Sequence, residues 1–278
     1  MTEAVLRILA CQITIPETRT RVARDRHLAD LASRLRSRLK PGEFDLIVLP
    51  ELSSIEYSDA AFGCLDELEE SLDGPSFETF SAIACDLGVA IAFGFPRRGS
   101  SGRHICQAVI GSDGRLLGHY DKLHAAEFGA SSETAHFRPG DHLFAFDLKG
   151  LRIAPVICYD IRFDGLFARL AREGVDLVLH CGAYFRDPSF HSWPHFVVTR
   201  AIEHNLLWLS LNRAGSDWGG SIWCPAHADS EQPEVRLGTD EIFWHLHARK
   251  SDRLAASGKI PIGRDRRRDY DDLVLMRG

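Results

Sequence analysis

The sequence predicts an α/β protein in which helices cover the outside of a mixed β-sheet system. Short, continuously apolar segments such as 45–49 and 175–179 are typical of strands buried on both faces, and they alternate with amphipathic helical segments. Two further apolar segments, 105–110 and 115–120, flank the loop 111–114, which indicates a hairpin. Some strands therefore pair antiparallel, and the sheets are expected to be mixed.

The first half of the chain begins with an apolar segment at 5–13, which predicts a strand. A helix should follow, because leucines recur at steps of three and four residues at Leu28, Leu31, Leu35 and Leu39. Pro41-Gly42 ends that helix, and the buried strand 45–49 leads to Glu51. Gly74-Pro75 starts a second helix through Leu87, followed by a strand at 89–93.

The second half starts with a segment from 121 to 140 that shows neither a helical nor a strand period, so we expect a long surface loop. Strands at 143–148 and 151–157 then lead to Cys158, and apolar residues at helical spacing follow from Leu166 to Ala171. The remaining predicted elements are a strand at 175–179, a helix at 191–204 and strands at 206–211 and 242–247.

Size and composition favour one large domain. The chain has 278 residues, of which 45% are hydrophobic, and we expect a core from about 5 to 270 with a solvated tail at 271–278. No charged-then-apolar leader precedes Val5, and no apolar run reaches the roughly 18 residues of a membrane span. We therefore expect a cytoplasmic protein without a membrane partner. The net charge of −6 argues against nucleic acid as a partner, because phosphate binding needs a basic face.

The seven cysteines are odd in number and widely spaced, and most lie in apolar segments. This pattern favours reduced core thiols over a disulfide framework, with one exception. Cys158 follows a predicted strand at a sharp turn into a helix, whose dipole and free amides lower a thiol pKa and hold an oxyanion. The alternative is a structural thiol, since cysteine is among the most buried residue types.

Two further polar residues occupy similar positions. Glu51 follows a buried strand, and Lys122 follows the hairpin strand that ends at Tyr120. Together the three groups suit cleavage of a carbonyl-nitrogen bond. Glu51 would take the thiol proton and pass it to the leaving amine, while Lys122 and the amide of Tyr159 would stabilise the oxyanion. The carboxylate raises the thiol pKa and the lysine lowers it, so the resting protonation stays open. Separately, Glu51 is also compatible with a helix cap and Lys122 with a solvated loop.

Taken together, these motifs resemble the nitrilase superfamily of carbon-nitrogen hydrolases. The resemblance runs from about 8 to 270 and rests on Leu49-Pro50-Glu51, on residues 120–124 (YDKLH) and on residues 157–163 (ICYDIRF), with further matches at 137–141, 200–205, 219–221 and in the arginine-rich segment before Tyr270. It implies a four-layer α-β-β-α sandwich that pairs into dimers or higher homo-oligomers. It also implies a catalytic Glu51, Lys122 and Cys158 triad with an auxiliary glutamate, placed at Glu133 with Glu127 as second choice.

The resemblance implies an amidase-like enzyme that hydrolyses a small linear amide through a thioester. Tyr159-Asp160 follows the nucleophile, where family nitrilases typically have Trp-Glu. The alternatives are N-carbamoyl hydrolysis, then nitrile hydrolysis, and, from another class, a catalytically idle binding or scaffold paralogue. The residues expected to contact substrate are Tyr159, Phe128, Phe163, Tyr184, Trp193 and Arg162, with Arg186 as a second candidate for a substrate carboxylate.

This chain departs from the common family pattern at Asp164-Gly165 and at 181–184, both of which tend to border the substrate pocket. Other enzyme classes fit less well. The sequence has no Cys-x-x-Cys or His-Glu-x-x-His, no Gly-x-Ser-x-Gly elbow, no P-loop and no Gly-x-Gly-x-x-Gly. We therefore expect neither a catalytic metal nor a cofactor.

Overall fold

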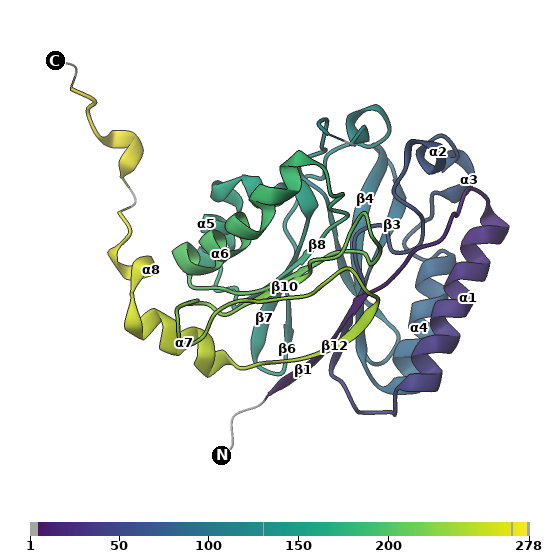
Figure 1. Cartoon of the computed structure of the whole chain (residues 1–278), viewed down its shortest axis with the longest axis horizontal. Coiled ribbons are helices and arrows are strands. Elements are labelled where there is room, and N and C mark those ends of the chain that lie inside the picture. Colours follow the sequence, from purple (N-terminus) through teal and green to yellow (C-terminus); the bar gives the residue numbers. More distant parts are fainter. Residues whose placement is uncertain (1–4, 130, 268, 277–278) are drawn as a thin grey trace.

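The computed structural model describes residues 5–129, 131–267 and 269–276, and within them two six-stranded sheets pack face to face (Figure 1). The first sheet has the spatial order β12 (Ile242–Ala248), β1 (Leu6–Gln12), β2 (Leu46–Val48), β3 (Ala90–Gly99), β4 (Gly102–Ile110) and β5 (Leu116–Asp121). The second has the order β11 (Val235–Arg236), β10 (Ile222–Cys224), β9 (Leu207–Leu211), β8 (Leu177–Cys181), β7 (Leu151–Ile157) and β6 (Phe146–Leu148).

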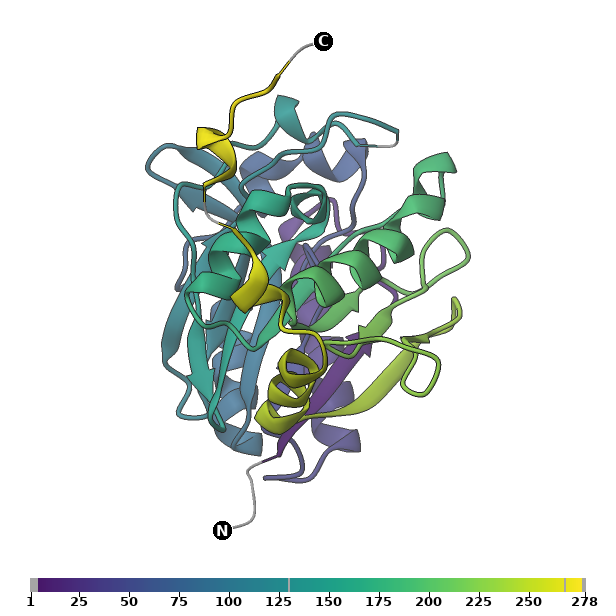
Figure 2. The same cartoon turned by 90° about the vertical axis from the view of Figure 1, so that its left-hand side faces the viewer.

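Helices form the two outer layers (Figures 1 and 2). The first sheet is covered by α1 (Arg21–Arg38) and α4 (Pro75–Leu87), and the second by α5 (Asp164–Arg172) and α6 (Trp193–His204). The shorter elements are α2 (Asp59–Phe62), α3 (Leu65–Leu68), α7 (Lys250–Lys259), α8 (Ile262–Asp265) and the 3-10 turns η1 (Glu133–Ala135), η2 (Cys158–Arg162), η3 (Pro188–Ser192) and η4 (Tyr270–Asp272). The predicted four-layer α-β-β-α sandwich is confirmed.

The core follows from strands whose two faces are both apolar. In β1, Leu6, Ile8 and Ala10 pack between the two sheets, whereas Leu9 and Cys11 pack under α1 and α4. Successive side chains of a strand point to opposite faces, so a continuously apolar strand serves both layers at once. This is why the sequence shows unbroken apolar runs instead of alternation.

The central strands of each sheet are parallel and the outer ones antiparallel. β1, β2 and β3 run parallel, as do β7, β8 and β9, while β3, β4 and β5 form an antiparallel meander. The hairpin predicted at 111–114 is confirmed as the β4–β5 connection, where Gly114 adopts φ +78°. Because two antiparallel steps separate β3 from β5, the carboxyl ends of β2, β3 and β5 lie at the same edge.

Several predicted boundaries were wrong. β8 begins at Leu177, two residues later than expected, because the amide of Val175 still caps α5 and Asp176 accepts a hydrogen bond from the amide of Arg152 at 2.9 Å. The helix expected at 191–204 is divided into η3 and α6. The segment between β5 and β6 is not simply a surface loop, because among its described residues Lys122, Ala126, Glu133 and Phe137 are buried.

The C-terminal part projects from the body of the molecule (Figure 1). Arg266, in the arginine-rich segment before Tyr270, donates from Nη2 to the carbonyl oxygen of Glu203 at 2.9 Å and contacts the ring of His204. Arg268, in the same segment, lies outside the described residues, as do 1–4 and the last two residues of the expected tail. Among the described helices, none combines the length and the apolar character needed to span a bilayer.

Candidate active site

Three strand ends meet around one buried ammonium group. Glu51 follows β2, Lys122 directly follows β5, and Cys158 directly follows β7. Lys122 Nζ donates to Glu51 Oε1 at 2.8 Å and to Glu133 Oε1 at 2.6 Å. Cys158 is close enough to Lys122 that a thiolate there would raise the pKa of the lysine. The structure therefore brings all four residues of the expected catalytic set into one cluster.

Glu51 is fully buried, and both of its carboxylate oxygens have partners. Oε1 accepts from Lys122, and Oε2 accepts from the backbone amide of Ala183 at 2.8 Å. Leu52, the next residue, is held at φ +46°, a conformation that is uncommon for a non-glycine residue. The buried Arg213 stabilises this turn, because its Nη2 donates to the carbonyl oxygens of Glu51, Leu52 and Ile55 at 2.9, 3.0 and 3.1 Å.

Glu133 enters the cluster from η1, in the segment between β5 and β6. Its Oε1 also accepts from the hydroxyl of Tyr57 at 2.7 Å, and its Oε2 accepts from the amide of Ala126 at 2.7 Å. Glu127, the other candidate for the auxiliary position, is exposed and accepts a hydrogen bond from the hydroxyl of Thr134. Of the two glutamates, the structure thus places Glu133 against Lys122.

The electrostatics of the cluster follow from burying charge. Burial alone would lower the pKa of Lys122, but Glu133 and Glu51 outweigh it and raise that pKa well above its usual value. Burial raises the pKa of Glu51, opposed by Lys122 and assisted by the charge of Glu133. The lysine therefore stays an ammonium, and Glu51 becomes a stronger base than an exposed glutamate.

Cys158 begins η2 with φ +45°, and only 8% of the residue is exposed. Burial raises the pKa of its thiol well above the usual range, and Glu51 adds to the rise while Lys122 opposes it. The expected lowering by a helix N-terminus does not dominate, because η2 is a five-residue 3-10 turn and the site already contains two carboxylates. The side chain of Cys158 is accordingly a thiol near pH 7.

Asp160 joins the nucleophile turn to the lysine segment. It is fully buried, and its carboxylate accepts from the hydroxyl of Tyr120 at 2.8 Å, the amide of Ile157 at 3.1 Å and the ring of His124 at 2.7 Å. These residues precede Cys158 or flank Lys122. Sequence reasoning did not assign this role, although the position of Asp160 two residues after the nucleophile was a usable signal.

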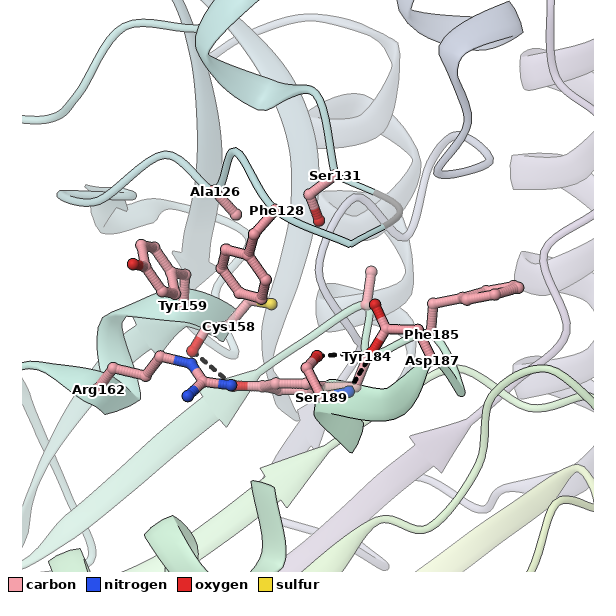
Figure 3. A pocket seen from close by; sticks show the side chains of 11 residues that line it. Ala126, Phe128, Ser131, Cys158, Tyr159, Arg162, Tyr184, Phe185, Asp187 and Ser189 are labelled. Atoms are coloured by element: carbon pink, nitrogen blue, oxygen red, sulfur yellow. Dashed lines mark hydrogen bonds between the residues drawn. The ribbon is translucent and has the colours of Figure 1, made fainter. Parts of the chain in front are cut away.

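A small pocket opens beside Cys158 (Figure 3). Its lining residues come mainly from the segment after β5, from η2 and from the segment after β8: Ala126, Phe128, Ser131, Cys158, Tyr159, Arg162, Ala183, Tyr184, Phe185, Asp187 and Ser189. The cavity volume is about 30 Å³, whereas one water needs about 10–15 Å³ by the same measure. In this conformation the pocket admits only a small group next to the thiol.

The structure corrects two of the expected pocket walls. Phe163 stacks on His124 with ring centroids 3.6 Å apart, and Trp193 is 1% exposed and stacks on Tyr184. Neither lines the pocket. Trp193 packs behind Tyr184, which does line it, and Phe163 also meets the lining residue Tyr159 edge-on, with ring centroids 5.1 Å apart. Arg186 is exposed and stacks on Phe190, outside the pocket. Arg162 does line it, held between the rings of Phe128 and Phe196.

One cluster of potential metal ligands occurs among the described residues, and it lies between α5 and α6: Asp164, Glu203 and His204. Arginines already neutralise it. Arg200 pairs with Glu203 at 2.5 Å, and Arg266 contacts the backbone of Glu203 and the ring of His204. None of the three ligand candidates lines the pocket beside Cys158.

A sequence model of the carbon-nitrogen hydrolases matches residues 7–238. The chain belongs to the carbon-nitrogen hydrolase family. Among curated relatives, the omega-amidase NIT2-A of Xenopus laevis is 26% identical over 240 residues, covering 81% of this chain and 83% of the relative. The curated relatives of this chain therefore include an amidase, and the family is that of the carbon-nitrogen hydrolases.

Solved carbon-nitrogen hydrolases share the fold. A superfamily protein of Xanthomonas campestris, solved with an arsenic adduct in its active site, has a TM-score of 0.76 at 24% identity, covering 98% of this chain and 99% of the other. An amidase variant of Nesterenkonia, solved with the acetamide moiety of fluoroacetamide added to its active-site cysteine, has a TM-score of 0.72 at 21% identity, with 97% of each chain covered. At these identities the likeness establishes the architecture.

Proposed function

We propose that this carbon-nitrogen hydrolase cleaves a small linear amide through a thioester on Cys158, with Glu51 as base and acid and Lys122 as oxyanion stabiliser. The observation that carries the proposal is the position of Lys122 between two fully buried carboxylates, 2.8 Å from Glu51 and 2.6 Å from Glu133, beside the cysteine that lines the pocket. A buried ammonium with two carboxylate partners is fixed in place.

Acylation would begin with the Cys158 proton moving to Glu51 as Sγ attacks the amide carbon. The Sγ–C bond forms, and the carbonyl electron pair moves to the oxygen, where Lys122 and the amide of Tyr159 stabilise it. The intermediate collapses when Glu51 returns the proton to the amine, so that the C–N bond breaks and ammonia leaves. Water then attacks the thioester with Glu51 again as base, releasing the acid and restoring the thiol.

The charges of the site support this proton path. Moving the proton from Cys158 to Glu51 leaves the net charge of the buried cluster unchanged, so no charge has to be created in a poorly solvated space. The pKa values of both groups are raised by burial, which keeps them closer to each other than burial of the thiol alone would. Lys122 keeps its charge throughout, because Glu133 stabilises it independently of Glu51.

The pocket and the relatives favour an amide over a nitrile. The curated relatives include omega-amidases, and the Nesterenkonia amidase carries an acetamide group on its cysteine. An amide adduct must expel an amine that needs a proton, which Glu51 is positioned to supply. Arg162, which lines the pocket, would pair with a distal carboxylate of the substrate, since its guanidinium donates to a neutral hydroxyl, Ser192 Oγ, at 3.2 Å.

The decisive experiment is ammonia release from matched pairs of short amides and nitriles, with and without a distal carboxylate, together with an N-carbamoyl panel. We expect the amide of each pair to release ammonia faster than the nitrile. The amides that carry a distal carboxylate should react fastest. Cys158→Ala should abolish turnover, and hydroxylamine should trap the acyl group from wild-type enzyme as a hydroxamate. Faster turnover of a nitrile than of its amide would overturn the amide assignment. Full activity of Cys158→Ala would exclude the thioester route.

A carbamoyl substrate reacting faster than every amide would favour the second candidate. Complete inertness of the wild-type enzyme towards all three classes, with Cys158 unreactive to alkylation, would favour a catalytically idle paralogue. The buried cluster argues against that outcome, because three ionisable groups held without solvent are costly to maintain for structure alone.

A further inference from the structure

The peptide oxygen of Cys158 is held by two side chains of the second sheet. Tyr184 donates its hydroxyl hydrogen to this oxygen at 2.6 Å, as drawn in Figure 3, and His180 Nε2 lies 2.9 Å from it. His180 belongs to β8, and Tyr184 follows the same strand. Neither residue belongs to the cluster around Lys122, and neither was assigned this contact from the sequence.

The direction of each hydrogen bond behind this peptide can be assigned. Trp193 Nε1 can only donate, and it lies 2.9 Å from Ser210 Oγ. Burial lowers the pKa of His180 to about 4, so the ring is neutral near pH 7 and carries one hydrogen. The carbonyl oxygen of Cys158 can only accept, so this hydrogen lies on Nε2. Nδ1 is then the acceptor of the Ser210 hydroxyl, 2.7 Å away.

This relay is built into rigid parts of the fold. His180 and Ser210 are register partners in the parallel pair β8–β9, and both are fully buried. The ring of Tyr184 stacks on that of Trp193, with centroids 4.4 Å apart and an interplanar angle of 8°. The two donors are therefore fixed before substrate binds.

The oxygen of Cys158 and the amide hydrogen of Tyr159 belong to the same peptide group. A hydrogen bond donated to a peptide oxygen draws electron density from the peptide nitrogen, so its N–H becomes a stronger donor. Tyr159 is the second residue of η2, and so its N–H has no acceptor inside that turn. The two donors also resist rotation of this peptide, which follows a cysteine at φ +45°.

We propose that His180 and Tyr184 are positioning residues that orient and polarise the Cys158–Tyr159 peptide, so that the Tyr159 N–H stabilises the oxyanion formed on Cys158. The inference rests on the proposed acyl transfer and extends it to residues that donate nothing to the substrate. No proton moves along the relay. When Sγ bonds to the carbonyl carbon, the electron pair moves onto the carbonyl oxygen, and the polarised N–H of Tyr159 donates a hydrogen bond to it.

The test uses Tyr184→Phe, which keeps the ring stacking and removes only the hydroxyl, and His180→Met, which removes the imidazole donor. His180→Gln serves as the conservative rescue, because its amide can donate. Removing a direct oxyanion donor lowers kcat by about a hundredfold or more. Weakening the Tyr159 N–H in Tyr184→Phe or His180→Met should therefore lower kcat by about tenfold and change KM by less than about threefold. His180→Gln should recover part of the loss, and the distant Tyr270→Phe should change nothing.

Two measurements separate this role from a merely structural one, both in a Cys85→Ser background that removes the exposed thiol. Iodoacetamide alkylates Cys158 without forming an oxyanion, so the alkylation rate of Tyr184→Phe and of His180→Met should match that of the wild type. Butyraldehyde adds reversibly to the thiol and forms a tetrahedral oxyanion-like adduct, so its protection of Cys158 against alkylation should weaken about tenfold in Tyr184→Phe and His180→Met.

Equal losses in alkylation and turnover would overturn the proposal, because they would mean that the nucleophile itself had moved. Unchanged aldehyde protection in Tyr184→Phe and His180→Met would also overturn it, as would an absence of aldehyde protection in the wild type. Because alkylation and protection need no turnover, they test the peptide even if no amide proves to be a substrate. A wild-type enzyme that hydrolyses no amide would refute the proposed function but not the role of this peptide. Thermal melting of each variant checks folding, and Ser210→Ala replaces His180→Met if the latter unfolds.

Discussion

Lys122 Nζ lies 2.6 Å from Glu133 Oε1, slightly closer than it lies to Glu51. Glu133 also accepts hydrogen bonds from Tyr57 and Ala126, so its carboxylate is fixed independently of Lys122. This arrangement suggests that Glu133 holds the ammonium in place while Glu51 remains available to move protons. The two carboxylates would then have separable effects on the reaction.

Glu133→Gln should lower kcat by about a hundredfold in a protein that stays folded, because the ammonium of Lys122 loses a charged partner. Glu127→Gln is the matched control, since Glu127 is exposed and contacts Thr134 instead. The measurement is the acylation rate from the ammonia burst. A larger loss in Glu127→Gln than in Glu133→Gln would show that the auxiliary glutamate had been assigned to the wrong residue.

The acid limb of the pH–rate profile should report Glu51. Burial raises its pKa above the usual 4.5, with Lys122 opposing and Glu133 assisting the rise. Activity needs ionised Glu51, so kcat/KM should fall as pH decreases through a value above 4.5. The pKa of Lys122 is raised, so its charge should produce no basic limb below about pH 10.

Glu133→Gln offers a check on that interpretation. Removing the charge of Glu133 should move the acid limb to lower pH, because that charge raises the pKa of Glu51. A limb that stays in place in this variant, or that survives in the residual activity of Glu51→Gln, would show that another group controls the profile.

Much of this site could be predicted because its residues end apolar runs. Glu51, Lys122 and Cys158 each follow a strand that the sequence marks clearly. Glu51 and Lys122 come from one edge of the first sheet, and Cys158 comes from β7 of the second sheet, which packs against it. Glu133 was predicted only from the family resemblance, since the segment around it shows neither a helical nor a strand periodicity. The short strands β10 and β11, of three and two residues, are too brief for any pattern to reveal.

The supporting contacts could not be predicted because they join distant parts of the chain. Tyr57 and Glu133 are 76 residues apart, and Arg213 and Glu51 are 162 apart. Trp193 was expected at the pocket as a large aromatic residue, yet its indole N–H has a buried acceptor, Ser210, that draws it inward. Similarly, Cys85 lies on an exposed face of α4, and Cys64 is half-buried, although both were expected to be core thiols.

We further predict that the protein forms at least a homodimer. The apolar strand β12 is partly covered, because Arg34 and Arg38 lie over the ring of Phe243. A bare apolar surface lies in the projecting segment 273–276, where Val274 is 87% and Met276 89% exposed. A second copy covering this segment would remove that surface from water.

Sedimentation at micromolar concentration should therefore give about twice the monomer mass of 31.1 kDa. Replacing Val274 and Leu275 by aspartate should shift the equilibrium towards monomer, whereas Asp272→Asn, next to the apolar run, should not. A wild-type monomer at this concentration would refute the prediction.

The last prediction concerns stability and the buried His204. Burial lowers its pKa to about 4, with Asp164 opposing and Arg266 assisting, whereas an unfolded histidine titrates near 6.5. The folded state thus keeps the ring neutral where the unfolded chain already binds a proton. Its contribution to stability is fully present above pH 6.5, is lost as pH falls from there to about 4, and is constant below. Between pH 7 and pH 5 the loss should be about 2 kcal/mol.

Urea unfolding of His204→Gln should therefore show a free energy that falls about 2 kcal/mol less than that of wild type between pH 7 and pH 5. His191→Gln, at an exposed position on η3, is the control for losing an imidazole and should keep the wild-type slope. Because carboxylates also titrate in this range, the evidence is the difference between variants and not the slope itself. Identical slopes for wild type and His204→Gln would mean that His204 gains its proton in the folded state as easily as in the unfolded chain.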